Sequence, residues 1–87
     1  MEQLPGYDAF AGCLGEQFEA SGLTMQLVEA TAGSRPEEFS LVFRGPTAPV
    51  LEQSIVDLHH DRLGDVGLFL VPIGPDAEGM QYQAVFA

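Results

Sequence analysis

The residue types that suit acid–base or metal chemistry gather in one short segment, "DLHHD", residues 57–61. His60 with Asp57 or Asp61 would place an imidazole beside a carboxylate, a combination found in hydrolases and metal enzymes. The segment alternates like a strand, however, and neighbouring strand residues point to opposite faces, so His59 and His60 are not expected to bind one ion. We predict no metal or other cofactor, and an enzyme using His60 is the least favoured of three functional hypotheses.

Nucleophilic catalysis has no support in the sequence. Cys13 is the only cysteine, so an intramolecular disulfide is excluded. It falls on the apolar side of a predicted helix, where a thiol is normally buried and unreactive. The serines occur in no G-x-S-x-G context, which is the pattern of a nucleophile elbow. The sequence therefore predicts no catalytic residue.

The charge balance excludes two classes of partner. Thirteen Asp or Glu residues stand against three Arg and no Lys, which gives a formal net charge of -10. Nucleic acid and anionic membrane surfaces both require cationic contacts, so we expect neither as a partner. The start, "MEQLPGYDAF", lacks the basic and apolar regions of a secretory signal, and no apolar run approaches the roughly 18 residues of a membrane span. We expect a cytoplasmic protein.

The elements that would position these residues are short, because Gly and Pro divide the chain at frequent intervals. One helix is expected over Tyr7–Leu14, with Phe10, Cys13 and Leu14 on one apolar face before Gly15. Segments with the period-two alternation of strands are 16–20, 23–31, 38–44, 54–60 and 80–86, and residues 66–73 are predicted as a further strand that is apolar on both faces.

This pattern predicts a single domain over residues 1–87, with residues 1–5 flexible. The fold class is mainly β: a small antiparallel barrel or roll of five to six strands, with one short N-terminal helix lying over it.

The segment "VGLFLVPI", residues 66–73, is apolar on both faces of its predicted strand. A strand without a polar face must be covered on both sides, and here the inner face would fill the barrel. The outer face needs a helix or a second copy of the chain as its cover. A helix of about eight residues spans only about 12 Å. We therefore predict an interaction surface, and a homodimer, formed by Phe69, Val71, Ile73 and Ile55.

Three further residues are predicted as anchors for a partner or ligand: Arg44, Tyr82 and His60. Arg44 ends an apolar strand just before a Gly-Pro turn, where its guanidinium could hold a partner's carboxylate in a bidentate manner. An ion pair within the chain is the competing interpretation. If Tyr82, Phe43 and Arg44 lie near the mouth of a barrel, they could also hold an apolar or acidic small molecule.

Two stretches, "FSLVFRGP" (residues 39–46) and "LHHDRLGDVGLFLVPIGPDAEGMQYQAVF" (residues 58–86), resemble a family of small uncharacterised bacterial domains. The shared patterns are F-S-L-x-F-R-G-P, H-x-x-L-G, L-F-L-V-P-x-G-P and Y-x-A-x-F, and "FAGCLGEQF" (residues 10–18) is similar to the family's opening. The resemblance covers most of the chain. It implies no assigned activity, and a loose association with phage-tail-like and tail-collar proteins implies an accessory or structural role.

The leading functional hypothesis is a non-catalytic protein-interaction or structural module, which binds a protein partner or a second copy of itself. It rests on the scarcity of catalytic motifs and on the excess of apolar strand surface. The alternative is a β-barrel that binds a small molecule.

Overall fold

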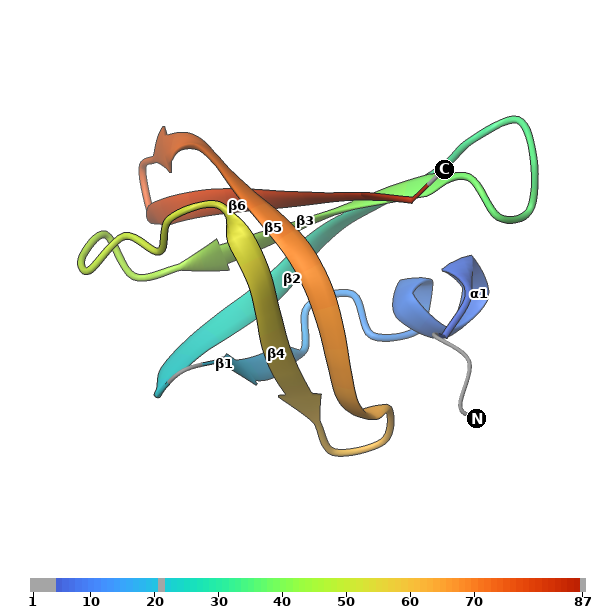
Figure 1. Ribbon diagram of the computed structural model, residues 1–87, viewed down its shortest axis with the longest axis horizontal. Coiled ribbons are helices and arrows are strands. Elements are labelled where there is room, and N and C mark those ends of the chain that lie inside the picture. Colours follow the sequence, from blue (N-terminus) through green and yellow to red (C-terminus); the bar gives the residue numbers. More distant parts are fainter. Residues whose placement is uncertain (1–4, 21, 87) are drawn as a thin grey trace.

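The computed structural model describes residues 5–20 and 22–86. Of the segment predicted to be flexible, residues 1–5, the first four therefore lie outside the described residues. In the described part, the elements in chain order are α1 (Tyr7–Ala11), β1 (Gln17–Ala20), β2 (Leu23–Ala32), β3 (Phe39–Gly45), β4 (Ser54–His60), β5 (Gly64–Asp76) and β6 (Gly79–Phe86). The strands form a closed antiparallel barrel in the order β1-β2-β3-β6-β5-β4 (Figure 1). The mainly β barrel with one short helix is confirmed.

The two longest strands bend, so that each serves two partners. β2 pairs with β1 through residues 23–26 and with β3 through residues 26–32, with a register shift between Leu27 and Glu29. β5 pairs with β4 through residues 64–70 and with β6 through residues 71–76, with a shift between Pro72 and Gly74. Pro72 has no N–H to donate and Gly74 has φ 120°, so this part of β5 suits a bulge.

The barrel closes where β1 meets β4, and this seam is short. Only two residue pairs join the strands, Glu19 with His59 and Ala20 with Leu58. By contrast, β3 pairs with β6, and β4 pairs with β5, through seven residue pairs each. The β1–β4 seam is therefore the weakest join in the ring of strands.

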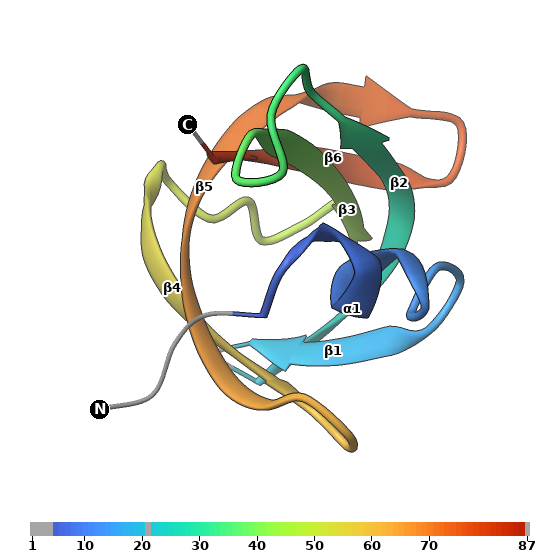
Figure 2. The same cartoon turned by 90° about the vertical axis from the view of Figure 1, so that its right-hand side faces the viewer.

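The core follows from the alternation of apolar residues along the strands. In β5, Val66, Leu68 and Leu70 are buried, and the inward residues of the other strands fill the same interior. Phe10 of α1 enters one end of the barrel and packs near Phe39 and Phe86, with ring centroids 6.1 and 6.0 Å away. Figure 2 shows α1 in the mouth of the ring of strands. The helix thus closes an end of the barrel.

The helix is shorter than predicted, because it ends at Ala11 and not at Leu14. The following N–H groups bond only three residues back, Cys13 to the carbonyl of Phe10 at 2.8 Å and Leu14 to that of Ala11 at 3.3 Å. These are the bonds of a tightened last turn. Phe10 and Cys13 are buried as expected, but Leu14 is 48% exposed.

Within residues 5–20 and 22–86, no helix is long and apolar enough to cross a membrane.

A close approach of two strands makes Gly79 necessary. A Cβ atom at this position would overlap the carbonyl oxygen of Gly45 on β3. We predict that Gly79→Ala lowers the free energy of unfolding by about 2–4 kcal/mol, because the backbones would have to separate. Chemical denaturation measures this loss. Gly12→Ala is the matched control, since Gly12 has φ -68° and only ordinary contacts. Equal stability of the two variants would contradict the prediction.

Candidate functional site

Residues from two distant parts of the chain form a polar cluster at one side of the barrel. Glu16 lies between α1 and β1, and Gly15, with φ 85°, turns the chain just before it. His60 and Arg62 belong to the β4–β5 hairpin, whose three-residue loop ends at Gly64 with φ 74°. Positive φ values favour glycine, so both turns depend on this residue type. The turns bring Glu16 against the hairpin.

His60 is 3% exposed and its hydrogen bonds define its tautomer. Its Nδ1 atom accepts the backbone N–H groups of Arg62, at 3.1 Å, and Leu63, at 3.2 Å. An accepting nitrogen carries no proton, so in the neutral ring the proton is on Nε2. Nε2 therefore donates to Oε1 of Glu16, 2.7 Å away.

Arg62 completes the cluster from the outside. Its Nη2 atom lies 3.0 and 3.1 Å from the two carboxylate oxygens of Glu16 and donates to them. These hydrogen bonds from Arg62, and then the one from His60, lower the pKa of Glu16. The carboxylate in turn raises the pKa of Arg62. We call Glu16, His60 and Arg62 the polar clasp.

Cys13 borders the clasp but does not act as a nucleophile there. Its Sγ atom lies 3.6 Å from Nη2 of Arg62. Burial, followed by the nearby charge of Glu16, raises the pKa of the thiol, which favours its neutral form. Both nitrogens of His60 are bonded elsewhere, so the imidazole does not serve as a base for Cys13.

The same hydrogen bonds argue against a metal centre. Donor atoms of Cys13, Glu16 and His60 lie within 4.8 Å of one another, which is compact enough for a cation. A metal-bound imidazole needs a free lone pair on one nitrogen and normally donates from the other. In His60, Nδ1 accepts two N–H groups and Nε2 carries the proton, while the Arg62 cation contacts Glu16 and Cys13. The residues do not fit a metal, and they form a structural clasp.

The structure does not bring His60 together with the acids predicted beside it. His60 faces the interior, whereas Asp57 lies on the exposed face of β4 and Asp61 is exposed in the hairpin loop. His59 is exposed and its Nδ1 atom is 2.8 Å from Asp65. Glu16, the actual partner of His60, is 44 positions away. No local pattern in the sequence signals this pairing.

Arg44 already holds a carboxylate of its own chain. Its Nε atom donates to Oδ2 of Asp76 at 2.9 Å, and both side chains are partly buried. The other oxygen of Asp76 accepts the backbone N–H groups of Glu78 and Gly79, at 2.8 and 2.9 Å. The bond from Arg44 is the main cause of a lowered pKa of Asp76. This ion pair secures the β5–β6 turn.

Tyr82 and Phe43 lie inside the barrel. Tyr82 is 1% exposed, and its hydroxyl accepts the N–H of Leu51 at 2.9 Å. Phe43 is fully buried and packs edge-to-face on Phe18 at 5.2 Å. A ligand inside the barrel would have to displace these side chains.

The predicted interaction surface lies on the outside of β4 and β5, away from α1. Ile55 and Phe69 are direct cross-strand neighbours and are 75% and 51% exposed. Ile73 is also exposed and Val71 is half-buried. We call these four residues the β4–β5 face. Helix α1 does not cover this face, because it occupies the end of the barrel (Figure 2).

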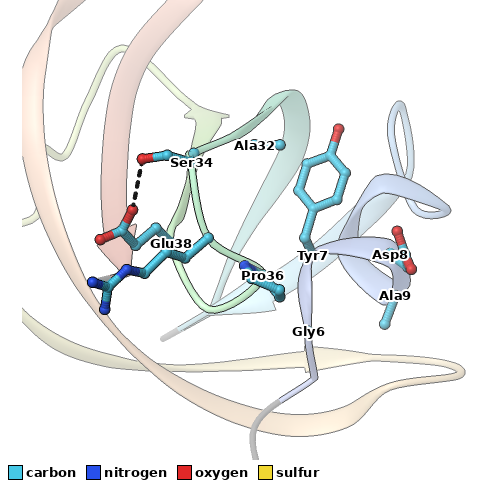
Figure 3. A pocket seen from close by; sticks show the side chains of 10 residues that line it. Gly6, Tyr7, Asp8, Ala9, Ala32, Ser34, Pro36 and Glu38 are labelled. Atoms are coloured by element: carbon cyan, nitrogen blue, oxygen red, sulfur yellow. Dashed lines mark hydrogen bonds between the residues drawn. The ribbon is translucent and has the colours of Figure 1, made fainter.

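A shallow groove of about 550 Å³ separates α1 from the loop between β2 and β3 (Figure 3). Tyr7 lines it from the helix, and Ser34 and Pro36 line it from the loop. The hydroxyl of Ser34 donates to Glu38 at 3.2 Å. This is an exposed bond between two side chains of one loop, and we assign the groove no chemistry.

A family model described as a domain of unknown function, DUF6916, matches residues 5–86. The chain belongs to the DUF6916 family. The match spans α1 and all six strands described above, so the DUF6916 domain is the whole barrel with its helix. Neither the curated proteins nor the solved structures give a significant match.

Replacing Glu16 tests the polar clasp. We predict that Glu16→Met lowers the free energy of unfolding by about 1–3 kcal/mol, because methionine leaves the buried Nε2–H of His60 without an acceptor. Glu16→Gln keeps an acceptor oxygen and should cost less. Urea denaturation of both variants gives the comparison, with Glu37→Gln on the surface as control. A smaller loss for Met than for Gln would contradict the clasp.

Proposed function

We propose that this domain is a non-catalytic module that binds another protein through the β4–β5 face. The observation that supports it is the exposed pair Ile55 and Phe69, which lie side by side on adjacent strands. Isolated apolar residues on a surface are ordinary, but a contiguous group is typical of an interaction site. Burial of apolar surface contributes about 25 cal/mol per Å², and aromatic residues are frequent anchors.

The arrangement of the polar side chains supports a role without catalysis. Among the described residues, His60, Glu16 and Arg62 bind one another, and Arg44 binds Asp76. These groups stabilise turns and strand ends, and none is left poised toward a substrate. The chemistry-bearing residues are thus used by the fold itself.

The scaffold beneath the β4–β5 face is suited to binding. β4 and β5 are paired through seven residue pairs, and Val56, Leu58, Val66 and Leu68 anchor their inner faces in the core. Such a surface loses little conformational freedom when a partner docks, so less binding energy is spent on ordering.

An accessory role in a larger assembly is the form of this function that we favour. The resemblance to domains associated with phage-tail-like proteins supports it as an analogy. The homodimer expected from the sequence would use the same face, so a second copy is a competing occupant.

The test is a quantitative pull-down from the native host with three baits. The wild type should retain a protein that is lost with the double variant Ile55→Ser, Phe69→Ser, because both changes remove apolar area from one face. Val50→Ser is the matched control, since Val50 is an exposed apolar residue outside this face. Circular dichroism confirms that all three baits are folded. If the three baits retain the same proteins in the same amounts, the β4–β5 face is not the binding site.

A further inference from the structure

We infer that the partner of the β4–β5 face presents apolar side chains next to Arg or Lys, and that it is not a second copy of this chain. This inference rests on the proposed function and adds the chemistry of the partner.

The first observation is a row of carboxylates that continues from the apolar pair along the same outer surface. The strand register places Ile55 opposite Phe69, then Asp57 opposite Gly67, and then His59 opposite Asp65. Side chains two residues apart on a strand share a face. The outer surface therefore changes from apolar to acidic within a few residues.

Neighbouring strand β1 extends the acidic part. Glu19 pairs with His59 across the β1–β4 seam and is exposed. Gly67 has no side chain, and a Cβ atom there would lie 3.3 Å from Oδ1 of Asp57 and 3.7 Å from Cγ2 of Ile55. The carboxylate of Asp57 thus lies directly beside the apolar pair. A partner that covers Ile55 and Phe69 must therefore also lie close to the Asp57 carboxylate.

The second observation is that the chain has few cations to offer to another copy. It contains three Arg and no Lys, and each Arg contacts a carboxylate of its own chain. Those contacts are Arg35 with Glu37, Arg44 with Asp76, and Arg62 with Glu16.

A symmetric dimer on this face would repeat the same surface on both sides of the interface. Where the acidic ends of the two copies met, Asp57, Asp65 and Glu19 would lie near one another, and in any orientation each copy would bring a net charge of -10. Like charges at an interface disfavour association, whereas a basic rim on a different protein would complement them. Charge complementarity therefore selects a basic partner with an apolar centre.

The experiment is an NMR titration of the full ¹⁵N-labelled chain with three synthetic peptides of about twelve residues. The first alternates Ile or Phe with Lys. The second replaces each Lys by Glu, and the third keeps Lys but replaces each apolar residue by Ser. The first peptide should shift the amides of residues 55, 57, 65 and 69 and bind about tenfold or more tightly than the others. Asp57→Asn should weaken that binding severalfold, whereas Glu37→Asn on the distant β2–β3 loop should not.

Two results separate the inference from the proposed function. If Phe69→Ser leaves the affinity for the first peptide unchanged, the β4–β5 face is not the docking site and the proposed function fails as well. If Phe69→Ser abolishes binding but the Lys and Glu peptides bind equally, the face is correct and the basic partner is wrong. Absence of shifts on this face with the first peptide also overturns the inference.

Light scattering of the free chain measures its oligomeric state and tests whether a second copy covers the β4–β5 face. A monomer is expected at moderate salt. A dimer that Phe69→Ser dissociates and Val50→Ser does not would identify a second copy as the occupant, and the basic partner would be wrong.

Discussion

Closure of the barrel depends on the polar clasp beside the β1–β4 seam. Two residue pairs alone join these strands, and residues 19 and 20 must meet residues 58 and 59 across a long stretch of chain. Ordering such a loop is entropically costly, so the join needs contacts beyond its few backbone bonds. The bond between His60 and Glu16 provides one, and the ring of Phe18 packs on that of His60 at 4.6 Å. Buried and fully bonded, His60 ties the hairpin to β1.

The rigidity of the proposed binding face depends on the pairing of β1 with β4 that closes the barrel. β4 has β5 on one side and β1 on the other, so an open seam would leave the β4–β5 hairpin attached to the barrel through β5 and β6 alone. Glu19, which belongs to the acidic end of the surface, pairs with His59 at the seam itself. The polar clasp, with His60 as its buried member, would thus also hold the apolar and acidic parts of the surface in register.

Local pattern was sufficient to predict the barrel, because alternation in 54–60 gives that strand and its buried face, and the apolar run 66–73 gives its neighbour. The sequence also identified Ile55 and Phe69 as outward apolar residues. It did not reveal whether they were covered, since alternation says nothing of where the helix packs. It also missed Glu16 as the partner of His60, because a pairing over 44 positions has no periodic signal. The helix end was misplaced because the backbone bonds after Ala11, and not the apolar spacing, determine it.

Native-state hydrogen exchange of the backbone amides tests the dependence on the clasp most directly. Because antiparallel residue pairs alternate between bonded and non-bonded, only one of the two seam pairs, Glu19 with His59 or Ala20 with Leu58, has its amides bonded across the seam. We expect these seam amides to exchange through a local opening in the wild type, more readily than the bonded amides of the β3–β6 pairs, and to exchange faster still in Glu16→Met. The account is contradicted if the seam amides are as well protected as those of β3 and β6, or if Glu16→Met leaves their exchange unchanged.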